Sequence, residues 1–476
     1  MAVFSNHYAQ LPERMFARVE PVHVPAPKLL AWNESLASEL GLADITPDKD
    51  ALAELFSGNR LPKGATPIAA AYAGHQFGHF VPRLGDGRAV LLGDVTDAAG
   101  RRFDVQLKGS GRTPFSRGGD GKSSLGPVIR EYLLSEAMHA LGVPTTRALA
   151  AIESGEQVQR ESALPGGVLT RVASSHIRIG SFEYFAVRGD VEAVRALADF
   201  AISRHAPELA DQPRPYVALF AEVVQRQAAL VAHWMSVGFI HGVMNTDNMT
   251  MSGETLDYGP CAFLDEYNAG KVFSSIDHHG RYAYDKQAPI AHWNLTRLAE
   301  CLLLLDDEQA VFIEHLDRFK PLFDQHYHDR MAAKLGLLPS DAVPMAEDAQ
   351  LVQQWLDYLQ QHALDFTQSF RELVVVADSL DAPRFGDFER QWRQRIARQP
   401  GGAAAAAAAM QAINPVYIPR NHQIERAIRD ALQGNYDVFN ELRVVLANPF
   451  DAQPEFAHYA QAPDAADRVT QTFCGT

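Results

Sequence analysis

The 476-residue chain lacks the features that mark secreted, zinc-binding and membrane proteins. It has three cysteines and no C-x-x-C pair, which argues against a disulfide scaffold or a zinc site. No apolar run approaches the roughly 18–20 residues of a membrane helix. The start, MAVFSNHYAQLPERM, has neither the basic end nor the apolar core of a secretion signal. These absences predict a cytoplasmic protein with no membrane partner.

The chain also has fewer basic than acidic residues. The formal net charge is -15, so the chain has no broad field that would attract nucleic acid or anionic lipid. We therefore expect no nucleic-acid partner, and any phosphate site must be a local cluster of Arg, Lys and backbone N–H groups. The content of 47% hydrophobic and 21% charged residues is typical of a well-folded protein with one large two-lobed unit or a few domains.

The order of elements predicts an α+β protein, with strands and one helix first and a mainly helical half after them. Strand patterns occur in RAVLLGDV, RRFDVQLKGSG and GGVLTRVA. Apolar residues at helical spacing predict helices over 123–141, over 216–237 and in NLTRLAECLLLL, and Gly142 and Gly238 end the first two. The run GGAAAAAAAM fits a helix and a surface linker equally well.

Lys108 ends the strand pattern FDVQLK, and the next helix carries Glu131 and Glu136. In a protein kinase, a strand lysine grips the nucleotide phosphates and pairs with a helix glutamate. The two glutamates are five residues apart and point in different directions, so at most one should face Lys108. Most lysines at strand ends are solvated, so Lys108 taken alone is weak evidence for a phosphate site.

Glycine-rich segments and two arginines are further candidates for phosphate binding. Gly85 and Gly87 predict a tight turn whose N–H groups could approach a phosphate, although a plain hairpin turn is the alternative. PFSRGGDGKSS is not a Walker A loop, because Ser116 stands where the first glycine is required. Arg171 and Arg178 could clamp a terminal phosphate or could form surface salt bridges.

The strip FIHGVMNTDNMTMSGETLDYG is similar to the catalytic and metal-binding segment of a kinase, with one residue changed. His241 precedes Asn248 by the kinase interval, and Asp257 begins D-Y-G in place of D-F-G. Val243 occupies the position of the kinase's catalytic aspartate. Asn248 and Asp257 suit Mg²⁺ or Mn²⁺, and Asp247 could accept a proton from an attacking hydroxyl. A simple turn at NTDN is the alternative interpretation.

Two histidine-containing segments do not indicate a metal site. GHQFGHF places His75 and His79 four residues apart, but no glutamate or third ligand lies nearby in the sequence. DHHGRYAYDKQ is equally ambiguous. We interpret both segments as structural.

Long stretches of the chain resemble the selenoprotein O family, the YdiU-type protein nucleotidyltransferases. The resemblance runs from about residue 10 to the last residues and is carried by GHQFGHFVPRLGDGRAVLLGDV, QLKGSGRTPFSRGGDGKSSLGPVIREYLLSEAMHALGVPTTRAL, SSHIRIGSFEYF, HGVMNTDNMTMSGETLDYGPCAFLD, DHHGRYAYDKQ and NPVYIPRNH. It implies a protein-kinase-like two-lobed fold. We expect an N-terminal extension over 1–60, an N-lobe over 61–190, a helical C-lobe over 191–400 and a C-terminal extension and tail over 401–476.

The resemblance also implies an activity. Members of this family transfer AMP from ATP to hydroxyl side chains of proteins, and they bind the nucleotide flipped relative to a kinase. A flipped nucleotide presents its α-phosphate, so an aspartate at position 243 is not needed and Asp247 suits the role of base. The resemblance thus implies a protein adenylyltransferase that uses ATP, Mg²⁺ or Mn²⁺ and the Ser, Thr or Tyr hydroxyls of protein substrates. We expect it to be a monomer.

Roles for individual residues follow from the same resemblance. Lys108 pairs with Glu131, Asn248 and Asp257 hold the metal, and Asp247 is the proton acceptor. The family's ATP-contacting positions are matched by Gly85, Gly87, Arg88, Lys108, Asp120, Gly121, Arg171, Arg178 and Asp257. The sequence leaves open UMP transfer from UTP, kinase-like γ-phosphoryl transfer and a non-catalytic nucleotide-binding pseudokinase.

The cysteines suggest a further hypothesis. Eukaryotic relatives in this family often end in selenocysteine near the C-terminus, and Cys474 takes that place here. We expect Cys474 and Cys261 to form a reversible regulatory disulfide that ties the tail across the catalytic segment. The alternative is that both are ordinary thiols. Cys301 lies in an apolar helix pattern and is interpreted as a core thiol.

Overall fold

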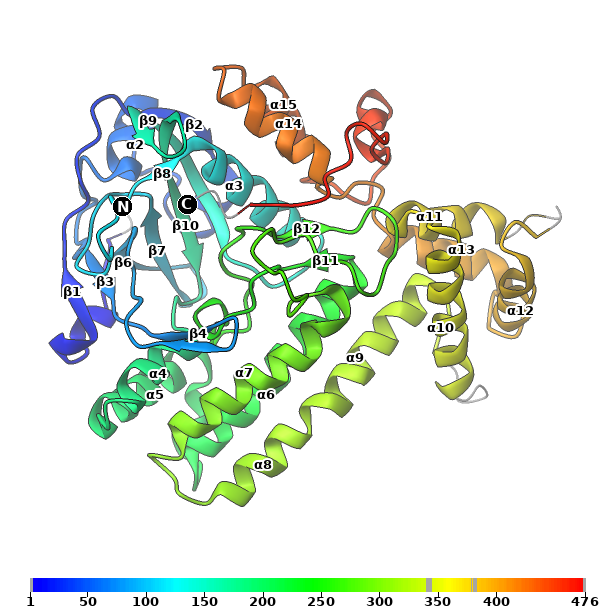
Figure 1. The fold of residues 1–476 in the computed structure, drawn as a ribbon, viewed down its shortest axis with the longest axis horizontal. Coiled ribbons are helices and arrows are strands. Elements are labelled where there is room, and N and C mark those ends of the chain that lie inside the picture. The colour runs from blue at the N-terminus through cyan, green and yellow to red at the C-terminus, as the bar shows by residue number, and fades with distance from the viewer. Residues whose placement is uncertain (1–2, 340–344, 378, 380–382, 474–476) are drawn as a thin grey trace.

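The computed structural model describes residues 3–339, 345–377, 379 and 383–473. Its first half is built on an eight-stranded antiparallel sheet (Figure 1). In chain order its strands are β1 (Phe16–Arg18), β2 (Lys28–Trp32), β3 (Ile68–Ala70), β6 (Ala89–Thr96), β7 (Arg102–Lys108), β8 (Ser123–Ser124), β9 (Arg147–Gln159) and β10 (Ala163–Ala173). The spatial order is β1-β3-β6-β7-β10-β9-β2, with β8 paired to β10. Residues 1–60 therefore supply a strand at each edge of the sheet.

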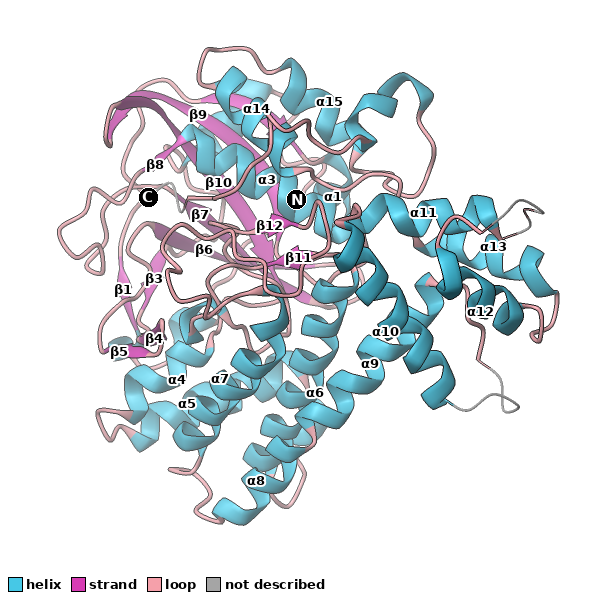
Figure 2. Ribbon diagram, turned by 45° about the vertical axis from the view of Figure 1, so that its right-hand side comes forward, coloured by secondary structure: helices cyan, strands magenta, loops and turns pink. Residues whose placement is uncertain are grey.

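Helices cover both faces of this sheet. On one face lie α1 (Glu34–Glu39) and α2 (Lys49–Ser57), whose Leu36 and Phe56 pack with the buried side chains of β6, β7, β9 and β10. On the other face lies α3 (Leu125–Ala140). The late helices α14 (Asn421–Ala431) and α15 (Asp437–Val445) pack on the outer side of α3 (Figure 2). The C-terminal extension thus covers the helix that carries Glu131.

The second half is helical and extends away from the sheet (Figure 1). Its helices are α4 (Ile179–Ala186), α5 (Val191–His205), α6 (Pro215–Ser236), α7 (Gln287–Leu302), α8 (Gln309–Asp317), α9 (Phe319–Lys334), α10 (Met345–His362), α11 (Phe366–Val376), α12 (Gly386–Ile396) and α13 (Gly402–Ile413). Two short strand pairs lie between the halves, β4 (Gly74–Gln76) with β5 (His79–Val81), and β11 (Phe239–Ile240) with β12 (Ala262–Phe263). Within the described residues, no helix is both long enough and apolar enough to cross a bilayer.

The α+β prediction and the main predicted elements are confirmed. The helix expected over 123–141 is α3, and Gly142, which follows its end, has a left-handed backbone conformation. The helix expected over 216–237 is α6. The alanine run forms helix α13, so the helix interpretation is right and the linker interpretation is wrong. Its Ala406 is fully buried, because Gly336 lets α13 approach so closely that a Cβ there would lie 2.8 Å from the Ala406 carbonyl oxygen.

A buried lysine lies in the helical half at the end of α9. Lys334 is 4% exposed, and its Nζ lies 4.3 Å from the ring centroid of Phe370 and 5.6 Å from that of Phe366. Among the described residues, no carboxylate pairs with it. Burial lowers the pKa of Lys334 to about 7, since the charged form is poorly solvated there. The cation–π contacts offset only part of this cost.

Lys334→Met should stabilise the protein in a pH-dependent way. Below about pH 7 the folded protein carries the buried charge, whereas above it the folded protein loses a proton that the unfolded chain retains. The variant should therefore gain about 2–4 kcal/mol in the free energy of unfolding near pH 6, and the gain should shrink as the pH approaches 10. Urea denaturation at several pH values measures it. Lys320→Met, at an exposed position of the same helix, is the control, and equal effects in both variants would contradict the prediction.

Candidate active site

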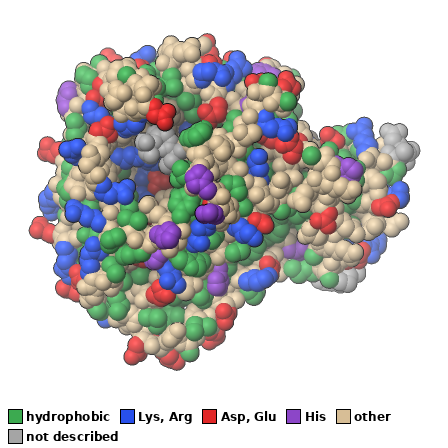
Figure 3. Space-filling view, in the orientation of Figure 1, with side chains coloured by type: hydrophobic (Ala, Val, Ile, Leu, Met, Phe, Trp, Pro, Cys, Tyr) green, Lys and Arg blue, Asp and Glu red, His purple; other side chains and the backbone are tan. Residues whose placement is uncertain are grey.

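A cleft between the sheet half and the helical half contains the predicted site. Its cavity measures about 870 Å³. Figure 3 shows a hollow over the sheet-bearing half, with Lys and Arg side chains around it. The predicted residues that line the cleft are Gly85, Gly87, Arg88, Lys108, Asp120, Gly121, Glu131, Arg171, Arg178, Asp247, Asn248 and Asp257. The structure thus brings together residues that are spread over more than 170 positions of the chain.

The centre of the cleft is a cluster of three cations around the Asp257 carboxylate. Oδ1 accepts from Lys108 Nζ at 2.5 Å and from Arg171 Nη1 at 2.6 Å, and Oδ2 accepts from Arg178 Nη1 at 2.8 Å. Burial opposes ionisation of Asp257, but Arg171, Lys108 and Arg178 outweigh it and hold the pKa of the carboxyl well below its ordinary value. The carboxylate is therefore charged at any physiological pH.

Glu131 completes this cluster from α3. Its two oxygens accept from Lys108 Nζ at 2.5 Å and from Arg171 Nη1 at 3.0 Å. Glu136 points elsewhere and binds Arg147 and the backbone N–H of Ala148, so only one of the two glutamates faces Lys108. Three cations against two carboxylates leave a net positive charge, which suits a polyphosphate.

Backbone pairing fixes the strip 239–259 against the start of α4. Ile179 N–H donates to Met249 O at 2.9 Å, and Met251 N–H donates to Ile177 O at 3.0 Å. These two bonds flank Arg178 and hold its side chain beside the strip. His241, the counterpart of the kinase histidine, is fully buried and its Nε2 lies 2.9 Å from Leu256 O. The beginning and the end of the strip are therefore held together directly before Asp257.

Asp257 itself adopts a left-handed backbone, with φ of +65°. Asp and Asn tolerate this conformation better than most residues, because their short polar side chains form local hydrogen bonds. The conformation directs the carboxylate towards the three cations. A residue with a larger or branched side chain would strain the backbone at this position.

Asp247 lies in the short 3₁₀ turn Thr246–Asn248 and is largely buried. Its Oδ1 is buried without a hydrogen-bond partner among the described residues, and its Oδ2 has a single long contact, 3.4 Å from Gln76 Nε2. Burial raises the pKa of Asp247 to about 6, an effect that Arg178 partly offsets. A carboxylate that lines a cleft and has few hydrogen-bond partners is typical of a catalytic group.

Two of the predicted glycines allow a close approach of neighbouring groups at the wall of the cleft. Gly85 has φ of +76°, and a Cβ there would lie 2.4 Å from the Phe115 ring. A Cβ on Gly121 would lie 2.1 Å from Gly111 O. Gly85 therefore lets the loop 109–122 lie against the 85–88 turn, and Gly121 lets that loop fold closely on itself. This close approach forms one wall of the cleft from backbone groups.

The remaining predicted nucleotide contacts lie near the mouth of the cleft. Among the described residues, no ion pair or side-chain hydrogen bond engages the Arg88 guanidinium. Asp120 is half-exposed and pairs with Arg160, whose Nη1 lies 2.9 Å from Asp120 Oδ2. Arg88 is thus an unneutralised cation on the wall of the cleft, whereas Asp120 is held by a neighbouring arginine.

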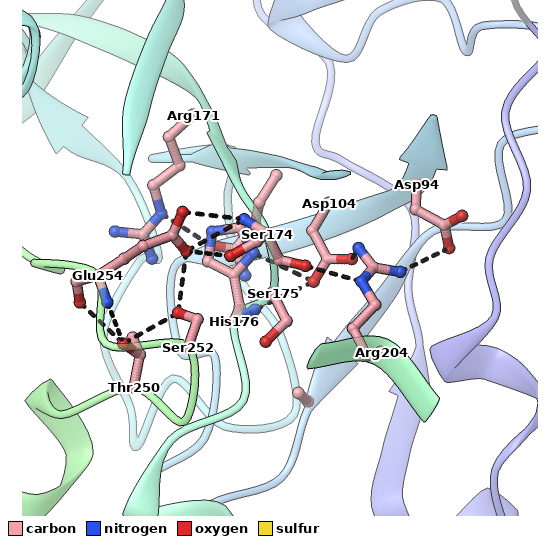
Figure 4. A network of polar contacts seen from close by, with 12 residues as sticks. Asp94, Asp104, Arg171, Ser174, Ser175, His176, Arg204, Thr250, Ser252 and Glu254 are labelled. Atoms are coloured by element: carbon pink, nitrogen blue, oxygen red, sulfur yellow. Dashed lines mark hydrogen bonds and ion pairs between the residues drawn. The ribbon is translucent and has the colours of Figure 1, made fainter. Parts of the chain in front are cut away.

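A buried polar network behind the cleft connects its two halves (Figure 4). Glu254, at the end of the strip, accepts from the backbone N–H and hydroxyl of Ser174 and from the hydroxyl of Ser252. Further along, Asp104 of β7 accepts from Arg204 Nη2 of α5 at 2.6 Å and from the His176 N–H at 3.0 Å. These bonds hold segment 174–176, which leads directly into Arg178.

The donor set in the cleft fits a Mg²⁺ or Mn²⁺ ion. Asn248 donates through Nδ2 to Val243 O at 2.9 Å, which leaves its side-chain oxygen available. Oδ2 of Asp257 accepts one hydrogen bond and retains a lone pair. Mg²⁺ commonly takes one or two protein ligands together with phosphate oxygens and water. Such a site needs no larger cluster, and among the described residues no group of three or more His, Cys, Asp or Glu could hold a metal.

Sequence reasoning missed several residues that support the site. Gln76 of β4 contacts Asp247, and Tyr72 lies under Arg178, whose Cζ is 4.6 Å from the ring centroid. Glu183 of α4 accepts from the Thr246 hydroxyl and pairs with His75. This pairing agrees with the structural interpretation of GHQFGHF, although Gln76 in the same segment faces the site. No local pattern marks these contacts.

The predicted Cys261–Cys474 disulfide is not tested, because Cys474 lies outside the described residues. Cys261 is fully buried in the segment that follows Asp257. The described part of the tail reaches this region, since Thr472 Oγ1 donates to Pro260 O and Thr472 N–H donates to Phe273 O at 2.8 Å. The disulfide stays a prediction.

The antiparallel sheet with α3 on one face, the Lys108–Glu131 pair and the strip that contains Asp257 define a protein-kinase-like fold. Over residues 1–447 the chain matches the family described as "Protein adenylyltransferase SelO", and it belongs to that family. It is 55% identical over 490 residues to the protein nucleotidyltransferase YdiU of Rhodopseudomonas palustris, with 99% of each chain covered. The protein of the same name from Bradyrhizobium diazoefficiens is 53% identical over 489 residues, and that from Rhizobium meliloti is 52% identical over 490, again with 99% of each chain covered.

Asp247→Asn should stabilise the metal-free protein, because an ionised carboxylate without adequate partners is replaced by a neutral amide. The cost of the charge is present above the raised pKa and vanishes once Asp247 is protonated in the folded and unfolded states. We expect the free energy of unfolding to rise by about 1–3 kcal/mol near pH 8 and to change little near pH 4. Chemical denaturation at the two pH values measures this, with the exposed Asp451→Asn as control. Destabilisation near pH 8 would show that Asp247 is needed for packing.

Proposed function

We propose that this protein transfers AMP from ATP to hydroxyl groups of protein side chains, with a divalent metal and a nucleotide held in the reverse of the kinase direction. The observation that carries the proposal is the combination, in one cleft, of the cation cluster at Asp257 with the underused carboxylate of Asp247. The family match and the names of the relatives support nucleotidyl transfer onto proteins.

In the proposed reaction, the hydroxyl oxygen of the acceptor attacks the α-phosphorus. The bond from that phosphorus to the pyrophosphate oxygen breaks, and the products are the AMP-modified protein and pyrophosphate. Asp247 takes the proton of the hydroxyl, because it lines the cleft and its carboxylate has only one long side-chain contact among the described residues, with Gln76. A carboxylate without competing hydrogen bonds needs little rearrangement to accept that proton.

The cations neutralise charge and position the substrate, which are the main tasks in phosphoryl transfer. Lys108, Arg171 and Arg178 would bind phosphate oxygens, and Arg88 and the glycine-rich backbone of the cleft wall would add donors. Arg171 and Arg178 are each 2% exposed and held by Glu131, Gln106 and the Asp247 carbonyl oxygen. They are therefore fixed before the nucleotide binds, and little ordering entropy is lost on binding.

Asn248 and Asp257 would hold Mg²⁺ or Mn²⁺ beside the phosphates. When bound, the metal would screen the negative charge of the phosphates and make the α-phosphorus more susceptible to attack. Asp257 would then exchange part of its pairing with the cations for the metal. Those cations would be released towards the phosphates, so the same carboxylate organises the cleft with and without substrate.

Val243 supports transfer of AMP over ordinary γ-phosphoryl transfer. It lines the cleft at the position of the kinase base and cannot take a proton, whereas Asp247 lies four residues further along the strip. An acceptor that approaches Asp247 comes from a different direction than an acceptor in a kinase. UMP transfer from UTP is a variant of the same chemistry.

ATP labelled on different phosphates tests the proposal directly. We expect α-label, but not γ-label, to enter a hydroxyl-bearing protein substrate, and Val243→Asp should not create γ-transfer, because the restored base would face the wrong end of the nucleotide. The same experiment with α-labelled UTP identifies the preferred base. Entry of γ-label into the substrate with the wild type or with Val243→Asp would contradict the reversed-nucleotide proposal. Binding of ATP without any transfer of label would indicate a pseudokinase.

Asp257→Asn and Asn248→Ala should differ in severity. Asn at position 257 keeps the left-handed backbone and the side-chain shape, yet it removes the charge that holds both the metal and the cations, so we expect turnover to fall by about a hundredfold or more. Asn248→Ala removes a neutral ligand that water can replace, and we expect a smaller loss that higher metal concentration partly restores. Metal titrations of turnover measure both. Near-normal turnover in both variants would place the metal elsewhere.

A further inference from the structure

A second cavity of about 530 Å³ lies directly beside the catalytic cleft. Phe77 and Ile276 line both cavities, so the second one continues the first on the far side of these two side chains. We call it the side groove. Most of its wall comes from Ile276 and from residues 277–281, where the DHHGRYAYDKQ segment begins, and the proposed chemistry gives this segment no role. Its volume is within the range of about 300–1,000 Å³ that is usual for ligand sites.

The side groove combines apolar and basic walls. Ile276 is 49% exposed and offers an apolar surface beside the cavity. The polar side chains of the lining are His278, His279, Arg281, Lys286 and Asp277. Hydrophobic, basic and histidine side chains lie close together on the face that Figure 3 shows. The chain as a whole has a net charge of -15, so a concentration of basic side chains such as that of the side groove is a local feature.

The lining holds one acidic side chain, and it is turned inwards to backbone groups. Asp277 is buried, and its two oxygens accept from the backbone N–H groups of Arg281 and Tyr282 at 2.9 and 2.8 Å. Asp285 lies outside the lining and is 3.7 Å from the exposed Lys286 Nζ. Within the lining, Arg281 and Lys286 outnumber Asp277, so the net charge of the lining is positive and complementary to an acidic ligand.

The side groove is rigidly joined to the catalytic strip. The Phe77 N–H donates to Asn245 Oδ1 at 3.0 Å and to Tyr282 Oη at 3.1 Å, and Tyr282 Oη donates to Asn245 Oδ1 at 2.6 Å. Asn245 is two residues before Asp247. Arg281 is held as well, with its Cζ 4.8 Å from the ring centroid of Trp293. A chain that places its hydroxyl at Asp247 must therefore pass over Phe77 and Ile276 or leave on the opposite side.

We propose that the side groove binds an acidic segment of the protein substrate next to the hydroxyl that is modified. The apolar part, Ile276 and Phe77, contacts the chain that leads to the hydroxyl. Lys286 and Arg281 bind the carboxylates of the neighbouring residues. This inference rests on the proposed transfer to protein hydroxyls and adds which substrates are preferred.

Binding of fluorescent peptides to the full chain, followed by anisotropy, tests the inference. Three peptides share one central serine and carry Glu, Gln or Lys at the flanking positions. Wild type should bind the Glu peptide at least about fivefold more tightly than the Gln peptide, and the Lys peptide most weakly. The difference should shrink near 0.5 M salt, because exposed charges are screened there.

Variants at exposed lysines separate the side groove from a general charge effect. Lys286→Glu should weaken binding of the Glu peptide about three- to tenfold, and Lys286→Arg should keep it. Lys320→Glu on α9 is the matched control, because that lysine is also exposed and lies beside one aspartate, and it should bind like wild type. Equal binding of the Glu and Gln peptides, or equal losses in Lys286→Glu and Lys320→Glu, would overturn the inference.

The transfer assay with α-labelled ATP distinguishes the two proposals. Label in the Glu peptide, with a higher kcat/KM than in the Gln peptide, supports both. Preferential binding of the Glu peptide with no label in any peptide would overturn the proposed transfer, while the side groove would stand as a site for acidic segments. Label without preference between the peptides would overturn only the side groove. Circular dichroism of each variant verifies the fold.

Discussion

One carboxylate, that of Asp257, holds the site together before any substrate is present. It accepts from Lys108 on β7, from Arg171 on β10 and from Arg178 at the start of α4. These residues come from the sheet, from the connection between the halves and from the catalytic strip. Without Asp257, three nearly buried cations would repel one another, and among the described residues Glu131 would be the one carboxylate still directly paired with any of them. The position of the sheet relative to the helical half therefore depends on this contact.

The network in Figure 4 supports the same junction from behind. Arg204 and Asp104 join α5 to β7, and Glu254 joins the end of the strip to Ser174. Because segment 174–178 is held at both ends, Arg178 has little freedom to follow a moving substrate. The cleft is thus a preorganised site, in which the protein pays most of the cost of ordering during folding and not during binding.

Local sequence patterns predict the parts of this site that depend on one element. The strand ending at Lys108 and the helix carrying Glu131 follow from periodicity, and their meeting follows from the resemblance to kinases. The strip around His241, Asn248 and Asp257 is continuous in sequence, so its spacing is enough to predict its similarity to the catalytic segment of a kinase.

Contacts between distant segments could not be predicted in this way. Gln76 and Asp247 are 171 positions apart, and nothing near either residue indicates the other. Residues 16–18 and 28–32 look like parts of an irregular extension, yet they pair at opposite edges of the sheet. The packing of Gly180 against the Ala73 carbonyl oxygen likewise joins segments that are far apart in the sequence. These features depend on which distant segments meet in the folded protein, and a local sequence pattern carries no information about that.

The position of α14 has a consequence for how the protein matures during translation. Glu425 pairs with Arg130 of α3, and Ile428 and Leu432 form part of the cleft wall, although they lie some three hundred residues after the helix that they cover. At about 5–20 residues per second, the ribosome has made Lys108 and Asp257 many seconds before these side chains emerge. A nascent chain therefore has the residues that we propose to bind the nucleotide before it has the finished cleft, so we expect the site to mature only when synthesis is almost complete.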